Sequence, residues 1–151
     1  MNAIDQLSGN WNYPTDLRFG SGRIGELHEC CSELGMRNPL LVTDRGLREM
    51  PMVRHAVQSC IDAGLGCGLY ADVQGNPVES NVTGGVAVYK AAGHDGVIAF
   101  GGGSGLDAAK AVALMVGQER PLFDYEDRED WYTRVNVQGM APVVAVPTTS
   151  G

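Results

Sequence analysis

The segment from Gly96 to Val116 constrains the fold of this chain more than any other. An apolar run, Gly96–Phe100, leads directly into the glycine turn Gly101–Ser104 and then into a helical pattern over Leu106–Val116. An apolar run without polar alternation is typical of a strand that is buried on both faces. A buried strand followed at once by a helix is the repeating unit of a parallel sheet. The segment therefore predicts an α/β protein.

Apolar runs alternate with helical patterns along the rest of the chain. Extended segments are predicted at Asp16–Phe19, Asn38–Asp44, Cys67–Val73 and Pro142–Pro147, and helices at Ile24–Leu34, Val53–Ala63 and from Pro77 onward. Asn76 is the expected cap of that last helix, and Glu79 the expected acid of a capping box. We predict one domain over residues 1–151: a Rossmann-like α/β fold, with a parallel sheet and helices on both faces.

Charge and composition exclude several classes of partner. The formal net charge is −7 and there is no run of Lys or Arg, so neither nucleic acid nor a membrane surface is expected. No stretch approaches the roughly 18 apolar residues of a membrane span. The first residues, Met1–Leu7, lack the basic and apolar regions of a secretory signal. The expected location is cytoplasmic and the expected ligands are small molecules.

The cysteines and histidines have no spacing that is typical of a metal site. The four cysteines, Cys30, Cys31, Cys60 and Cys67, form no C-x-x-C pair, and His28, His55 and His94 are scattered singly. Zinc sites usually present closely spaced pairs of such residues. We expect the thiols to be structural, and we predict no metal ligand and no catalytic residue within this chain.

Polar and glycine residues follow several predicted strands. Asp44, Asn76, Gly101–Ser104 and Thr148–Gly151 each come just after a strand, so in a parallel sheet they meet at one edge. Ligands of such sheets bind beyond the carboxyl ends of the strands. This edge is the predicted binding site.

Two glycine loops compete for a phosphate-binding role. Gly20–Gly25 satisfies G-x-G-x-x-G, with Asp44 at a suitable distance downstream, but the strand before it is short and polar. Gly101–Ser104 joins an apolar strand to a helix N-terminus, whose N–H groups and dipole attract an anion, and this loop is favoured. Ser104 is expected to donate its hydroxyl or to cap the helix, with Asp107 reaching back from the first turn. An ion pair between Asp107 and Lys110 is the alternative.

Several motifs together resemble the N-terminal domain of the iron-containing alcohol dehydrogenases. Gly101–Lys110 is similar to the G-G-G-S-x-x-D-x-x-K signature of that family, and Pro147–Gly151 to the start of its P-T-T-x-G-T-G-S-E segment. Four weaker similarities occur in the same order, at Arg18–Gly22, Leu41–Asp44, Gly75–Pro77 and Asp124–Tyr125. The resemblance covers nearly the whole chain.

The resemblance implies a site for NAD, with NADP as the alternative. It places the pyrophosphate on the Gly101–Ser104 turn and gives the F-G-x-G cluster a structural role. The implied cofactor-binding residues are Asp44, Asn76, Gly101, Gly102, Gly103, Ser104, Asp107, Thr148 and Thr149. Asp44 would accept hydrogen bonds from the adenosine ribose and repel a 2′-phosphate, although Arg45 could accommodate that phosphate. An ordinary turn residue is the other reading of Asp44.

The resemblance also implies parts that this sequence lacks. Family members hold Fe2+ or Zn2+ with an Asp and three His on a second, all-helical domain, which would follow Gly151. We therefore interpret the chain as a truncated dinucleotide-binding domain, inactive alone, from an enzyme that acts on an alcohol or aldehyde and is expected to be a homo-oligomer. A glycerol dehydrogenase, a maleylacetate reductase, a dehydroquinate synthase-like enzyme and a non-catalytic nucleotide-binding module remain alternatives.

Overall fold

The computed structural model describes residues 8–12 and 14–150, and its centre is a four-stranded parallel sheet. The strands are β3 (Pro39–Asp44), β4 (Gly68–Val73), β5 (Gly96–Gly101) and β6 (Val143–Pro147). Their order in the sheet is β4-β3-β5-β6. The chain therefore builds outward from β3 to β4, crosses back, and continues on the other side with β5 and β6. The predicted parallel α/β fold is confirmed.

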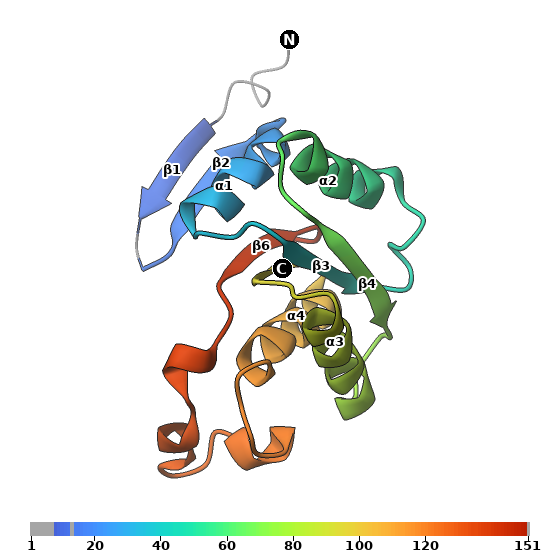
Figure 1. The fold of residues 1–151 in the computed structure, drawn as a ribbon. Helices are drawn as coiled ribbons and strands as arrows, with labels where there is room; N and C mark the ends of the chain where they lie inside the picture. Colours follow the sequence, from blue (N-terminus) through green and yellow to red (C-terminus); the bar gives the residue numbers. More distant parts are fainter. Residues whose placement is uncertain (1–7, 13, 151) are drawn as a thin grey trace.

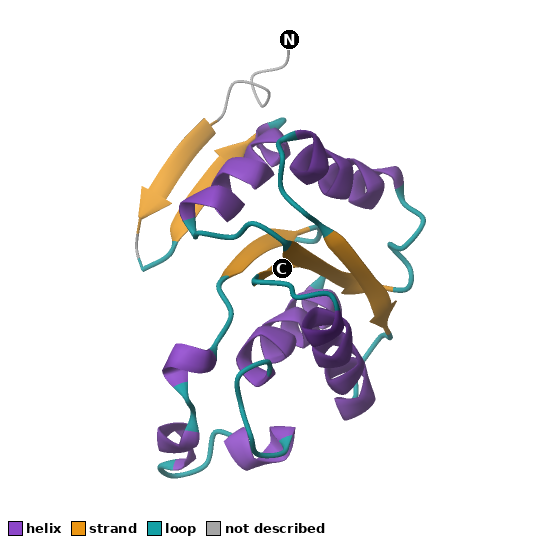
Figure 2. Cartoon of the chain, in the orientation of Figure 1, coloured by secondary structure: helices purple, strands orange, loops and turns teal. Residues whose placement is uncertain are grey.

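Helices cover both faces of the sheet (Figure 1, Figure 2). The helices α1 (Leu27–Glu33) and α2 (Pro51–Asp62) pack on one face, and α3 (Glu79–Ala91) and α4 (Gly103–Met115) pack on the other. All residues of β5 are buried, and alternate side chains of β3 enter the two cores. The apolar runs reflect this two-sided burial.

The start of α3 differs from the prediction. Asn76 does not cap the helix: it adopts a left-handed backbone with φ of 53°, a conformation that Asn tolerates better than most residues. Val78 occupies the N-cap position, and the Asn81 side-chain oxygen accepts its N–H at 3.0 Å. The Asn81 amide also donates to the carbonyl oxygen of Asp72, at 3.2 Å, which ties α3 to β4. The predicted capping box with Glu79 is therefore wrong, because Asn81 takes that role.

An antiparallel hairpin precedes the parallel sheet. Its strands are β1 (Ser8–Asn12), which was not predicted, and β2 (Asp16–Gly20), which matches the predicted extended segment. Arg18 on β2 binds three carboxylates of the following helical segment, with N–O distances of 3.0 Å to Glu26, 3.2 Å to Glu29 and 2.6 Å to Glu33. These ion pairs attach the hairpin to α1.

The segment between α4 and β6 contains three short 3-10 helices. These are η3 (Leu122–Tyr125), η4 (Trp131–Arg134) and η5 (Val137–Gly139). The Trp131 ring packs against the guanidinium of Arg134, 3.9 Å from the ring centre. Within the part of the chain that the structure describes, no helix has the length and apolar character that a membrane crossing requires.

Candidate cofactor-binding site

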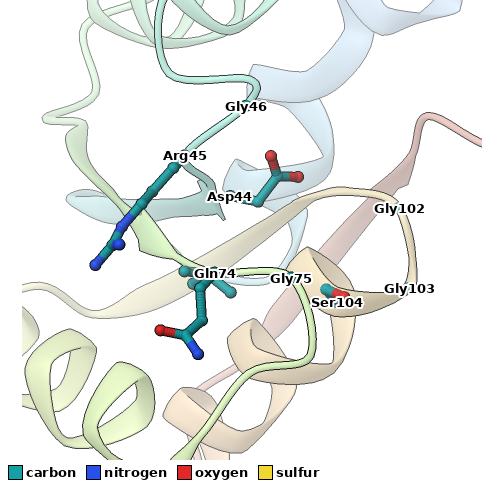
Figure 3. Close-up of a pocket in the computed structure, with 9 residues that line it drawn as sticks. Asp44, Arg45, Gly46, Gln74, Gly75, Gly102, Gly103 and Ser104 are labelled. Carbon is teal, nitrogen blue, oxygen red and sulfur yellow. The ribbon is translucent and has the colours of Figure 1, made fainter.

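A cleft of about 390 Å³ lies beyond the carboxyl ends of three strands. It is lined by Asp44, Arg45 and Gly46 after β3, by Val73, Gln74 and Gly75 at the end of β4, and by Gly102, Gly103 and Ser104 after β5 (Figure 3). The order of the sheet reverses between β3 and β5, which are hydrogen-bonded neighbours. Open parallel sheets bind ligands at this kind of reversal. The predicted edge is therefore the edge that carries the cleft.

The glycine turn brings bare backbone to this cleft. Gly101 has a φ of +143°, and a Cβ there would lie 3.3 Å from the Asp44 Oδ2 atom. At Gly103, the first residue of α4, a Cβ would meet no protein atom within 4 Å, so the space beside it is open. The N-cap residue is Gly102, which has no side chain that could cap the helix. The first N–H groups of a helix have no partner within the helix, so this N-terminus suits an anion.

Gly105 shapes the candidate site through its packing, and the sequence analysis did not single it out. A Cβ at this position would lie 3.1 Å from the carbonyl oxygen of Phe100 and 3.7 Å from the backbone nitrogen of Asp44. The absence of a side chain lets α4 approach the ends of β3 and β5 closely. Close helix-to-strand packing is the usual role of the last glycine in a dinucleotide-binding turn, and its place in the strand–turn–helix pattern was the available signal.

Asp44 combines a structural contact with a place in the cleft. Its Oδ1 atom accepts the N–H of Leu47 at 3.1 Å, which stabilises the turn after β3. Its Oδ2 atom lies on the side of Gly101 and Gly105. Figure 3 shows the neighbouring Arg45 side chain extending in a different direction from the Asp44 carboxylate. Asp44 is thus a turn residue that also presents a carboxylate to the cleft.

The threonines after β6 lie next to the glycine turn. The Thr148 N–H donates to the carbonyl oxygen of Gly101 at 2.9 Å. The Thr149 side chain lies 3.4 Å from the position that a Cβ on Gly102 would occupy. Both threonines are exposed and border the cleft without lining it. The structure therefore brings the two strongest sequence motifs into contact.

Two other predicted site residues lie outside the cleft lining. Asn76 is exposed, and its neighbours Gln74 and Gly75 line the cleft in its place. Asp107 is exposed and is the fifth residue of α4, so it does not reach back from the first turn. The predicted N-cap role of Ser104 is also wrong, because α4 begins earlier than predicted and Gly102 takes that position. Ser104 does line the cleft.

The competing glycine loop occupies a different place. Gly20 ends β2 of the antiparallel hairpin, and Gly22, with a φ of +79°, precedes the four-residue helix η2 (Arg23–Glu26). The residues that line the cleft come from the ends of β3 and β4, the start of α4 and the loops after β3, β4 and β5, and none of Gly20–Gly25 is among them. The geometry gives Gly20–Gly25 the role of a chain reversal before α1. Among residues 8–12 and 14–150, no group of three or more His, Cys, Asp or Glu side chains could hold a metal ion.

Relatives of known function match most of this chain. The 4-hydroxybutyrate dehydrogenase of Cupriavidus necator is 38% identical over 141 residues, which cover 92% of this chain and 36% of that protein. The 1,3-propanediol dehydrogenase of Klebsiella pneumoniae is 34% identical over 150 residues, covering 98% of this chain and 36% of that protein. The chain thus spans about a third of the length of these relatives.

Solved structures and a family model agree with these relatives. A 1,3-propanediol oxidoreductase structure is 33% identical and superposes with a TM-score of 0.79, over 88% of this chain and 34% of that protein. An NADH-dependent butanol dehydrogenase from Thermotoga maritima is 28% identical, with a TM-score of 0.75, over 88% of this chain and 32% of that protein. The model of the family "Iron-containing alcohol dehydrogenase" matches residues 14–151. This chain therefore belongs to the iron-containing alcohol dehydrogenase family.

Proposed function

We propose that this chain forms the cofactor-binding part of an NAD-dependent alcohol dehydrogenase. The observation that carries the proposal is the cleft at the reversal of the sheet, where the glycine turn leads into the N-terminus of α4. The names of two relatives support the choice of cofactor. One is the NAD-dependent methanol dehydrogenase of Bacillus methanolicus, 29% identical over 142 residues, and the other is the NADH-dependent butanol dehydrogenase of the solved structure.

The residues of the cleft fit a dinucleotide in two places. The open space at Gly103 and the first N–H groups of α4 suit a pyrophosphate, since no side chain blocks the approach to the backbone. Asp44, at the end of the neighbouring strand, offers carboxylate oxygens to a ribose. Thr148 and Thr149 lie across the glycine turn, where they would border the nicotinamide half. Asn76 and Asp107 lie outside the lining, so we assign them at most contacts at the rim.

The role of this chain in the reaction is to bind and orient. The nicotinamide ring, when bound, would accept hydride from the carbinol carbon of an alcohol or return it to an aldehyde. The backbone of the glycine turn would fix the pyrophosphate, and Asp44 would fix the adenosine end. We place the substrate pocket, and the Fe2+ or Zn2+ that the family resemblance implies, in the part of the relatives that this chain does not cover.

Calorimetric titration with NAD tests the proposal. Gly103→Val adds a side chain in open space at the helix N-terminus, so the fold should persist while NAD binding is lost. The matched control is Gly22→Val, where the positive φ should cost about 1–3 kcal/mol of stability and leave NAD affinity unchanged. The proposal fails if the unmodified chain does not bind NAD. The assignment of the loop is wrong if Gly103→Val binds normally and Gly22→Val does not.

A further inference from the structure

Asn81 is a buried polar residue that does not line the cleft. Its exposed fraction is 5%, and it lies in the first turn of α3. The Oδ1 atom accepts the N–H of Val78 at 3.0 Å, and the Nδ2 atom donates to the carbonyl oxygen of Asp72 at 3.2 Å. The side chain therefore uses both its acceptor and its donor, as a buried amide must if it is not to destabilise the fold.

The segment between these two bonds forms one wall of the cleft. Residues 74–78 link the end of β4 to the first residue of α3. Gln74 and Gly75 of this link line the cleft, beside Val73 at the end of β4 (Figure 3). The position of the link relative to the sheet therefore sets the shape of the cleft on this side.

The two ends of the link are held in different ways. At its start, the Arg45 N–H donates to the carbonyl oxygen of Val73 at 2.9 Å, which joins β4 to the loop after β3. At its far end, the Asn81 side chain joins Val78 back to Asp72. Within residues 8–12 and 14–150, no other side chain bonds to the backbone of Asp72 or Val78. The Asn81 amide group thus closes the link into a loop of fixed ends.

A separate contact anchors the first turn of α3. The Tyr70 hydroxyl, which comes from β4 and is buried, donates to the backbone carbonyl oxygen of Asn81 at 2.9 Å. A Cβ at Gly84 would lie 2.6 Å from the same hydroxyl oxygen, so α3 packs directly on it. This bond uses the backbone of Asn81 and not its side chain. Anchoring of the helix and closure of the link therefore depend on different groups.

We infer that Asn81 is a positioning residue for the cofactor, because its side chain holds residues 74–78 where Gln74 and Gly75 form a wall of the cleft. The role depends on the proposed function. The link follows β4, which lies at the opposite end of the strand order from β6. In the proposed binding mode, the threonines after β6 border the nicotinamide half, so the link faces the adenosine half. Loss of the Asn81 bonds should weaken binding of that half, although Asn81 itself touches no ligand.

Two variants of Asn81 test the inference. Asn81→Ala removes both side-chain bonds, and Asn81→Asp keeps an acceptor for the Val78 N–H but loses the donor to Asp72. Without cofactor, amide hydrogen exchange in residues 74–78 should be faster in both variants than in the unmodified chain. If the link then occupies its binding arrangement about a tenth of the time, the Kd for NAD should rise about tenfold. ADP, which carries only the adenosine half, should lose the same factor. Asn81→Ala buries no charge, so it still tests the inference if Asn81→Asp does not fold.

Tyr70→Phe is the matched control, because it removes a buried hydrogen bond to the same residue and leaves the Asn81 side chain intact. It should lower the melting temperature, while hydrogen exchange in residues 74–78 and the Kd values for NAD and ADP stay unchanged. An equal loss of affinity in Tyr70→Phe and Asn81→Ala would show a general effect of stability and would overturn the inference. So would unchanged exchange in residues 74–78, or faster exchange with unchanged affinity. Hydrogen exchange needs no cofactor, so these outcomes differ from failure of the proposed function, in which the unmodified chain binds neither NAD nor ADP.

Discussion

The Asp44 carboxylate makes one hydrogen bond that the fold uses and presents its other oxygen toward the glycine turn. Oδ1 accepts the Leu47 N–H at 3.1 Å, and Oδ2 lies on the side of Gly101. An Asn at this position keeps an oxygen that can accept the Leu47 N–H but removes the negative charge. Asp44→Asn therefore tests the effect of the negative charge in the cleft while it keeps the hydrogen bond that stabilises the turn.

At the residue scale we predict that Asp44→Asn narrows the preference for NAD over NADP. Removal of a carboxylate next to a 2′-phosphate removes a like-charge repulsion, so NADP should gain about tenfold relative to NAD, or about 1.4 kcal/mol. Titration calorimetry with both cofactors measures the gap, and the melting temperature checks that the turn is intact. Equal affinity of the unmodified chain for NAD and NADP would rule out this role of Asp44.

The positions of single site residues were predictable where the residue directly follows a predicted strand. Asp44 and Gly101–Ser104 follow apolar strands directly, and the structure brings them to one cleft. Asn76 lies three residues beyond β4, and α3 begins only at Glu79, with Asn81 accepting the Val78 N–H, which no local pattern in the sequence reveals. The packing of α1 on α2, which buries Cys31 and Cys60 in the same core, was also not predictable, because it is a tertiary contact.

At the scale of elements, the buried strands were the most predictable parts. β3 and β5 are buried on both faces, and their uninterrupted apolar sequences indicate this directly. β1 was missed because Ser8–Asn12 has no apolar alternation, and its pairing with β2 is a tertiary contact. The start of α4 was predicted three residues late, because glycines are poor helix formers and this helix begins with two of them among its first three residues.

The contact between α3 and α4 depends on a glycine, and we predict that Gly85→Ala destabilises the fold. A Cβ at Gly85 would lie 2.6 Å from the Cγ2 atom of Val112 and 3.3 Å from the Tyr70 ring. Val112 is buried and β-branched, so it cannot rotate away easily. Overpacking of this kind costs about 1–3 kcal/mol, which exceeds the gain in helix propensity of about 1 kcal/mol.

Urea unfolding of the Gly85→Ala chain measures this cost. The matched control is Gly25→Ala, since a Cβ at Gly25 meets no atom within 4 Å and its φ is not positive. The control should unfold at or slightly above the midpoint of the unmodified chain, because an unstrained Gly→Ala change reduces the entropy of the unfolded chain. A midpoint for Gly85→Ala at or above that of Gly25→Ala would show that α3 and α4 are not in close contact there.

For the whole molecule, the topology of the sheet explains why distant motifs form one cleft. The order β4-β3-β5-β6 sets the ends of β3 and β5 side by side, so Asp44 meets the glycine turn although 57 positions separate it from Gly101. Strand–helix alternation predicts a parallel sheet, but several strand orders satisfy it, and packing selects among them. The expected homo-oligomer and the contribution of a second, helical domain remain predictions at this scale.

Adding Fe2+ to this 151-residue chain should not change its melting temperature, and the chain should still not oxidise an alcohol. A site that activates an oxygen ligand needs three or four donor groups that converge on one ion, and residues 8–12 and 14–150 present no such group. A ligand at 100 times its Kd would stabilise the folded state by about 2.7 kcal/mol, so specific binding would be visible as a rise in melting temperature. The relatives are about three times longer than this chain, and a chain extended to their length should show both the metal-dependent rise and turnover with NAD. Stoichiometric Fe2+ binding by the 151-residue chain, measured anaerobically by metal analysis after desalting, would contradict the placement of the metal outside it.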